Sequence, residues 1–238
     1  MLLIHRYEIL ASTNDEAKRL IGEGAAAHGT TVTADSQTGG RGRAGRVFVS
    51  PAGGLYMSVV IAGCQGDGGI DSPALLTVAA GVAVTRALED ALSIETGIKW
   101  VNDIIYKGKK VGGILAETYG GFAVVGIGLN LRTESLSPEL PEAGSLLDVA
   151  GELKPYELAE VVRDRLLELC DNFDKPAVIG EYRRKSVLLG KPVTVFAGDN
   201  SCDAVAVGIG ADGELIISLP DGTRQALTYG EVRVRQVL

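Results

Sequence analysis

The residues with the clearest chemical potential lie in one short segment, GGRGRAGRVF at positions 39–48. It places three arginines, Arg41, Arg43 and Arg46, among four glycines. An arginine side chain presents a planar set of donors that matches a carboxylate or a phosphate. Glycine lets the backbone approach a ligand closely and expose its N–H groups. The segment therefore predicts an anion-binding loop, although on its own it is equally compatible with a surface loop whose charge serves no ligand.

Three of these glycines also match G-x-G-x-x-G, the fingerprint of dinucleotide-binding folds: Gly40, Gly42 and Gly45. That fold requires a helix to begin at the last glycine, because the helix N-terminus holds the pyrophosphate. The residues that follow, RVFVSPAGG, are rich in β-branched side chains and contain a proline, so no helix is expected there. We favour instead a loop that brings a carboxylate and a triphosphate together despite their mutual repulsion.

Four further segments place polar or charged side chains at the ends of apolar runs: STN at 12–14, KWVND at 99–103, KKVGGILAE at 109–117 and GIGLN at 126–130. STN lies at a strand-to-helix junction, where it could face a ligand or simply cap the helix. In KWVND, a strand would put Lys99 and Asp103 on the same side, because side chains alternate along it. The glycines before Ile114 permit close backbone approach, and Asn130 at the end of a buried strand needs a polar partner.

The composition limits the class of partner. The 238 residues carry a formal net charge of −7, which disfavours general binding to DNA or RNA, since such domains are usually basic. The three cysteines, Cys64, Cys170 and Cys202, form no C-x-x-C pair, which favours a reducing compartment. The sequence has no signal-peptide pattern and no apolar run of about 20 residues. We therefore expect a cytoplasmic protein that does not contact a membrane.

The elements that must position these residues follow from periodicity and turn signals. A T-x-x-E capping box at Thr13 and Glu16 is expected to open the first helix, and Ser72 with Pro73 to open a long buried one. The expected helices cover 13–22, 73–92, 155–173 and 177–187. The expected strands cover 6–10, 29–37, 55–63 and 122–131, with a strand–turn–strand hairpin over 98–118 whose tip is at 107–109. The stretch 133–153 is expected to form a loop.

The last part of the chain has a different character. From Gly190 to Leu238, short β-rich runs alternate with turn residues at Gly198–Asn200, Asp212–Gly213 and Asp221–Gly222. This pattern predicts a small meander or barrel. At about fifty residues such a unit is marginal alone, so it should pack on the rest of the chain.

Taken together and in this order, STN, GGRGRAGR, SPAGGLYMS, KWVND, KKVGGILAE and GIGLN closely resemble the biotin protein ligases (biotin–[acetyl-CoA-carboxylase] ligases) over essentially the whole chain. The resemblance implies an α+β fold. A mixed β-sheet catalytic domain packed with helices, similar to class II aminoacyl-tRNA synthetases, would cover 1–187, and a small C-terminal SH3-like β-barrel would cover 188–238. Bifunctional members carry an N-terminal winged helix-turn-helix. This chain begins at the catalytic domain, so a ligase without repressor function, and without DNA as a partner, is implied.

The resemblance also implies a reaction in two steps. The biotin carboxylate attacks the α-phosphate of MgATP to give biotinyl-5′-AMP, and a lysine of a biotin carboxyl carrier domain then takes the biotinyl group. No covalent enzyme intermediate is expected, since Cys64 lies in a loop without a histidine. The carrier could add to an exposed strand edge. A homodimer through sheet edges is compatible with the sequence, which does not fix it.

The resemblance assigns residues to both substrates and to Mg²⁺. Arg43, Lys110 and Lys99 are the implied catalytic residues, which supply positive charge. The implied contacts to biotin are Ser12, Thr13, Asn14, Gln37, Arg41, Gly42, Arg43 and Lys110. The implied contacts to ATP are Arg46, Phe48, Lys99, Asn102, Asp103 and Asn130, with Asp103 also ordering the metal ion.

Two positions depart from the family pattern. Phe48 stands where many members have tryptophan, which predicts less stacking area on the ligand. Val101 replaces a proline common in K-W-P-N-D, which predicts a looser turn before Asn102. Two other functions stay open: a lipoate or octanoate ligase or transferase of the same fold, and a non-catalytic biotin sensor.

Overall fold

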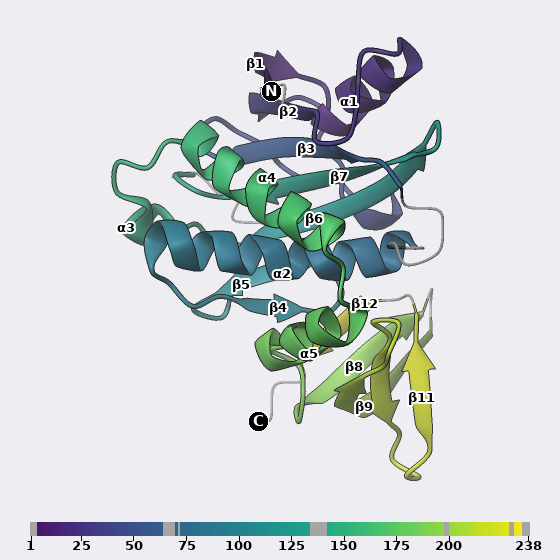
Figure 1. Ribbon diagram of the computed structural model, residues 1–238. Coiled ribbons are helices and arrows are strands. Elements are labelled where there is room, and N and C mark those ends of the chain that lie inside the picture. The colour runs from purple at the N-terminus through teal and green to yellow at the C-terminus, as the bar shows by residue number, and fades with distance from the viewer. Residues whose placement is uncertain are drawn as a thin grey trace.

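A mixed β-sheet frames the larger part of the protein. The computed structural model describes residues 4–63, 70, 72–133, 142–197, 200–228 and 231–234. Within them, seven strands pair in the order β1-β2-β3-β7-β6-β5-β4 (Figure 1). They are β1 (Ile4–Leu10), β2 (Thr31–Gln37), β3 (Leu55–Ile61), β4 (Gly97–Lys99), β5 (Asp103–Tyr106), β6 (Lys109–Tyr119) and β7 (Phe122–Leu129). Only β1 and β2 pair in parallel, joined by helix α1 (Thr13–Gly22), and the other neighbours are antiparallel.

Helices cover both faces of this sheet. Helices α2 (Pro73–Leu92) and α4 (Pro155–Asp171) lie side by side across one face (Figure 1). Helix α1 packs on the other face, where Val60 and Val124 belong to its small apolar cluster while Val59 and Val125 belong to the main core. This division follows from the alternation of side chains along a strand. The sequence of α2 is mostly apolar, and most of its residues are therefore buried.

A second, antiparallel sheet follows helix α5 (Lys175–Lys185). Its described strands pair in the order β11-β10-β9-β8-β12, and closure into a barrel is not shown by these pairings. The strands are β8 (Pro192–Ala197), β9 (Asn200–Ile209), β10 (Leu215–Ser218), β11 (Arg224–Leu227) and β12 (Glu231–Val234). The expected small β unit is therefore present, with Asp212–Gly213 and Asp221–Gly222 between strands. Of the turn expected at 198–200, the first two residues lie outside the described residues, and Asn200 begins β9. Cys64 also lies outside the described residues.

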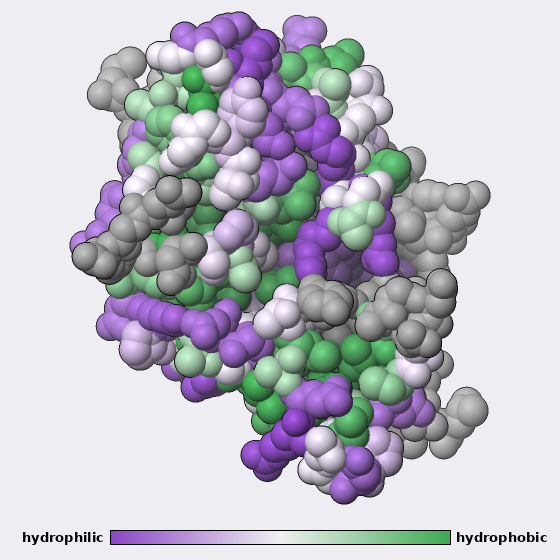
Figure 2. All heavy atoms as spheres, turned by 90° about the vertical axis from the view of Figure 1, so that its right-hand side faces the viewer, coloured by the Kyte–Doolittle hydropathy of each residue, from purple (hydrophilic) through white to green (hydrophobic). Residues whose placement is uncertain are grey.

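The small sheet is anchored to the large one through the turn between β9 and β10. The indole N–H of Trp100 donates to the carbonyl oxygen of Gly213 at 2.9 Å, and this hydrogen bond is buried. Arg183 of α5 donates through Nε to the carbonyl of Ile209 at 2.7 Å. In Figure 2, hydrophobic side chains gather where the two parts of the molecule meet, below a recess bordered by hydrophilic ones.

Trp100→Phe should lower the free energy of unfolding by about 1–3 kcal/mol, because it leaves the buried Gly213 carbonyl without its donor. Urea unfolding measures this change. The control is Tyr119→Phe, which alters a tyrosine that is 46% exposed and should leave stability within about 0.5 kcal/mol of the parent. Equal midpoints for the two variants would show that the Trp100 hydrogen bond does not stabilise the junction.

Most expected elements are present, and four differ in detail. The capping box is wrong, since Ser12 is the N-cap without a side-chain cap bond and Glu16 binds Tyr7 and Arg19 instead. The expected hairpin contains three strands, because the chain turns at Trp100–Asn102. The stretch expected to be a loop holds a short helix, α3 (Leu147–Ala150), in its described part.

The helix expected at 177–187 is α5, which begins at Lys175 and is capped by the Asp174 side chain. The Ser72 cap is confirmed by its bond from the Leu75 N–H.

No helix in the described ranges is both long enough and apolar enough to cross a membrane.

Candidate active site

The arginine segment forms a hairpin-like loop that begins at the end of β2. Backbone bridges join Gln37 to Ser50 and Arg41 to Val47, and Phe48 donates its N–H to the carbonyl of Gly40 at 2.9 Å. The tip is a single 3₁₀ turn at 43–45, in which Gly45 adopts a positive φ of 72°. A Cβ on Gly40 would lie 2.4 Å from the Phe48 carbonyl oxygen, so this position requires glycine. No long helix follows the last glycine, which agrees with the rejection of a dinucleotide-binding turn.

Residues expected to contact biotin meet at the start of α1. Ser12, Thr13 and Asn14 are each no more than 5% exposed. The backbone N–H and the hydroxyl of Thr13 both donate to Gln37 Oε1, at 2.9 and 3.3 Å. Gln37 Nε2 then donates to the Ser50 hydroxyl at 3.0 Å. The polar groups of this corner are thus oriented by one another before any ligand enters.

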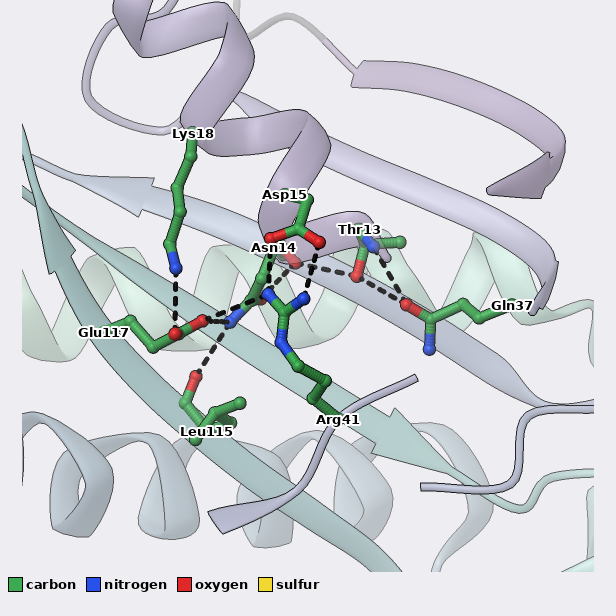
Figure 3. A network of polar contacts seen from close by, with 9 residues as sticks. Thr13, Asn14, Asp15, Lys18, Gln37, Arg41, Leu115 and Glu117 are labelled. Atoms are coloured by element: carbon green, nitrogen blue, oxygen red, sulfur yellow. Dashed lines mark hydrogen bonds and ion pairs between the residues drawn. The ribbon is translucent and has the colours of Figure 1, made fainter. Parts of the chain in front are cut away.

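Both polar atoms of the Asn14 side-chain amide form hydrogen bonds within the protein (Figure 3). Its Nδ2 donates to Glu117 Oε2 at 2.7 Å, and its Oδ1 accepts from the Ser58 hydroxyl at 2.6 Å. Asn14 therefore lies in the expected region but acts on the site through its neighbours. Ser58 and Glu117 were not among the expected site residues. Their only signal was a polar side chain within an apolar strand, inside two of the quoted segments.

Arg41 points away from the tip of the loop, towards α1 (Figure 3). Its guanidinium forms a two-pronged ion pair with Asp15, in which Nη1 lies 2.6 Å from Oδ2 and Nη2 contacts Oδ1. Glu117 lies farther off, with Oε2 3.9 Å from Nη2. The hydrogen bond from Arg41 holds the pKa of the Asp15 carboxyl below its ordinary value.

Arg43, at the tip, reaches the segment that contains Asn102 and Asp103. Its Nη1 lies 3.5 Å from Asn102 Oδ1, and burial lowers the pKa of the Arg43 guanidinium although Asp103 nearby opposes this. Asp103 Oδ1 forms an ion pair with Lys110 Nζ at 2.6 Å. A second hydrogen bond orients the Asn102 side chain, because its Nδ2 donates to the Ile114 carbonyl at 3.0 Å. The structure thus brings together four of the expected residues from three separate segments.

Lys99 does not lie on one strand with Asp103. It lies on β4 and Asp103 lies on β5, paired across the two antiparallel strands rather than along one strand. Residues paired directly across antiparallel strands point to the same face, so the two side chains still share one side, as expected. The break between the strands was not expected because the turn at Trp100–Asn102 contains neither glycine nor proline. Lys99 is 17% exposed, with its Nζ 3.5 Å from Glu142 Oε2. Arg46 is exposed on the returning arm of the loop.

Two hydrogen bonds from residues far away in sequence hold the turn at Trp100–Asn102. The Trp100–Val101 peptide bond is cis. The hydroxyl of Tyr182 donates to the Val101 carbonyl at 2.9 Å in the core. Burial raises the pKa of Tyr182 far above its ordinary value, so the hydroxyl stays a neutral donor. The hydrogen bond of Trp100 to Gly213 holds the other side, and the looser turn expected from Val101 stays a prediction.

Phe48 lies over a floor made by two glycines. A Cβ on Gly128 would lie 2.5 Å from Phe48 Cε1, and one on Gly113 would lie 3.5 Å from Cε2. The ring also meets Tyr56 edge-on, with centroids 6.4 Å apart. Gly113 was expected to permit a close backbone approach, and in the structure Gly113 and Gly128 make room for a side chain of the protein itself.

Asn130 carries an unused acceptor. Its Nδ2 donates to the Gly144 carbonyl at 2.9 Å, while its Oδ1 is buried without a hydrogen-bond partner in the described part of the chain. Buried polar atoms are rarely left in this state. Since the donor side of the amide is fixed by Gly144, this oxygen is an acceptor without a partner among the described residues.

Two family models match the chain. The biotin/lipoate A/B protein ligase family matches residues 7–133, and the biotin protein ligase C-terminal domain matches residues 188–235. The biotin–[acetyl-CoA-carboxylase] ligase of Mycobacterium tuberculosis is 31% identical over 93% of this chain and 85% of its own. The bifunctional ligase/repressor BirA of Bacillus subtilis is 39% identical over 61% of this chain, and the match spans only 46% of that relative.

Solved structures extend the likeness to the fold. The biotin protein ligase of Aquifex aeolicus, in complex with biotin and ATP, superposes with a TM-score of 0.85 at 28% identity, and each chain is covered fully at 100%. The biotin protein ligase of Leishmania major, in complex with biotinyl-5-AMP, gives 0.70 at 28% identity and covers 94% of this chain and 98% of that one.

Proposed function

The chain belongs to the biotin/lipoate A/B protein ligase family, and from this premise we propose that it joins biotin to a carrier protein through biotinyl-5′-AMP. The observation that carries the proposal is the way the arginine loop joins two groups: at its tip Arg43 meets Asn102 beside the Asp103–Lys110 pair, and at its base Gln37 meets the buried Thr13. One end of this arrangement offers cations and the other offers neutral hydrogen-bonding groups. A biotin carboxylate and a triphosphate need the first, and the ureido ring of biotin needs the second.

In the first step, an oxygen of the biotin carboxylate attacks the α-phosphorus of MgATP, the bond to the β-phosphate breaks, and pyrophosphate leaves. The role of Lys110 and Arg43 is to offset negative charge where two anions must approach, and such groups act most strongly when they are positioned in advance. Lys110 is positioned by Asp103, and Arg43 by burial and the Asn102 contact.

Mg²⁺ would enter with ATP. Among the described residues, no cluster of three or more His, Cys, Asp or Glu side chains could hold a metal ion. Magnesium commonly needs only one or two carboxylates together with substrate phosphates. Asp103, beside Asn102, fits that limited role as an oxygen ligand.

The unused oxygen of Asn130 supports adenine as the base. Adenine carries an exocyclic amine, which is a donor, where guanine carries an oxygen. An amide held by Gly144 so that Oδ1 faces the ligand can accept from the first and repels the second. Phe48, which lies half-buried over its glycine floor, is placed to contact a flat ligand ring.

In the second step, the amine of a carrier lysine attacks the acyl carbon of the mixed anhydride and AMP leaves. We propose a biotin carboxyl carrier domain of a carboxylase as the acceptor, a cytoplasmic setting, no role in binding DNA, and a catalytic unit over 1–187 with a β unit over 188–238. A lipoate ligase is the second candidate of this family, but the C-terminal model that matches belongs to biotin protein ligases.

The deciding experiment incubates the pure protein with ATP, Mg²⁺ and biotin and seeks biotinyl-5′-AMP by mass spectrometry. Biotin-dependent exchange of labelled pyrophosphate into ATP should accompany it, and lipoate should not support exchange. Exchange with lipoate alone would assign the second candidate. Tight biotin binding with neither adenylate nor exchange would instead identify a sensor.

A further inference from the structure

Four side chains of alternating charge tie the arginine loop to two other elements. In order they are Asp15 of α1, Arg41 of the loop, Glu117 of β6 and Lys18 of α1 (Figure 3). Lys18 Nζ lies 2.8 Å from Glu117 Oε1, which closes the chain of charges back on α1. The partners come from positions 26 and 76 residues apart from Arg41, on either side of it in sequence. They make no use of the residues at the tip of the loop.

This network borders the candidate biotin corner. Glu117 also accepts from Asn14 Nδ2 at 2.7 Å, and Asp15 follows Asn14 directly in the first turn of α1. At the base of the loop, Gly39 donates its N–H to the Ala11 carbonyl at 2.9 Å. Arg41 is thus held on the side of α1, whereas Arg43 reaches Asn102 on the other side. The two arginines have different partners, and we therefore infer different roles for them.

We propose that Asp15 and Glu117 are positioning residues that fasten the arginine loop through Arg41, and that this fastening sets how long the acyl-adenylate stays bound. The proposal rests on the proposed function. A two-pronged arginine–carboxylate contact is geometrically specific. The Arg41 and Asp15 side chains are nevertheless 38% and 49% exposed, and exposed pairs contribute little each. An exposed pair of this kind can break and re-form, so it holds the loop against α1 without fixing it there.

The first test needs no ligand. Trypsin cleavage after Arg43 and Arg46, located by mass spectrometry, reports opening of the loop. Cleavage after Arg41 is not scored, because removing its partner changes that side chain directly. Asp15→Asn keeps the shape of the side chain and removes its charge, and we expect cleavage two- to fivefold faster, as for the loss of a favourably arranged exposed pair. Asp15→Glu should recover part of the parent rate.

The chain offers a closely matched control. Arg165 contacts Asp90 at 2.7 Å and also Glu168, with exposures of 38% and 41% for the Arg165 and Asp90 side chains. Asp90→Asn therefore removes a pair of the same kind that does not involve the loop. It should leave loop cleavage at the parent rate. Raising the salt concentration should bring the parent towards Asp15→Asn, because exposed ion pairs are screened.

The second test measures release of preformed biotinyl-5′-AMP by rapid filtration. Asp15→Asn should release it two- to fivefold faster than the parent and Asp90→Asn. Equal rates for the two variants in both tests would overturn the proposal. If the parent forms no biotinyl-5′-AMP, the proposed function fails, while loop cleavage still decides whether Asp15 fastens the loop.

Discussion

Lys110→Ala is expected to slow biotinyl-5′-AMP formation roughly 10²–10³-fold, the range seen when a positioned electrostatic group is removed from an active site. Lys110 is a third exposed at 36%, with its Nζ 2.6 Å from Asp103 Oδ1, so its charge is held at one place. The substitution leaves that carboxylate without a counterion where triphosphate must bind. Biotin-dependent pyrophosphate exchange measures the loss, and calorimetry measures biotin binding, which should weaken less.

The control for this experiment lies on the same hairpin. Lys107 pairs with Asp148 at 2.8 Å and is 66% exposed, so Lys107→Ala removes a paired lysine that has no place in the candidate site. It should keep exchange within about twofold of the parent, as expected for an exposed pair. Exchange that survives Lys110→Ala at the level of Lys107→Ala would remove Lys110 from the catalytic residues.

Local signals in the sequence predicted the parts of the fold that depend on neighbours along the chain. Ser72 and Pro73 start α2 because capping is completed within one turn. Lys107–Gly108 forms the tip between β5 and β6 because both residues adopt a positive φ, of 46° and 75°. By contrast, the turn between β4 and β5 has no such residues and depends on Tyr182 and Gly213, far away in sequence.

The site residues show the same contrast between local signals and contacts made by residues far apart in sequence. The family resemblance assigned Arg43 and Lys110 to one site, and in the structure they reach the neighbouring residues Asn102 and Asp103. Residue type was not enough to separate Arg41 from Arg43, since their partners Asp15 and Asn102 are chosen by packing. The role of Ser58 was hidden for the same reason: its hydroxyl meets residues 44 and 45 positions away. Period and spacing along one strand cannot report such contacts.

Gly126→Ala is expected to damage the candidate biotin corner although it substitutes no polar residue. The new Cβ would lie 2.4 Å from Asn14 Oδ1 and 3.0 Å from its Cγ, closer than real contacts allow. Asn14 is 4% exposed and held by Ser58 at 2.6 Å and Glu117 at 2.7 Å, so it can move only by breaking these bonds. Such overpacking costs about 1–3 kcal/mol of stability.

Because Asn14 neighbours Thr13, which donates to Gln37, the same displacement should weaken biotin binding at least about tenfold, the equivalent of 1.4 kcal/mol. Calorimetry with biotin and urea unfolding measure the two effects separately. Gly208→Ala is the control, since a Cβ there meets nothing closer than Ile216 at 3.7 Å and Gly208 also lies within a strand. If Gly126→Ala binds biotin as tightly as Gly208→Ala does, Asn14 does not position the groups that hold biotin, and the corner must be organised by Gln37 and Ser50 alone.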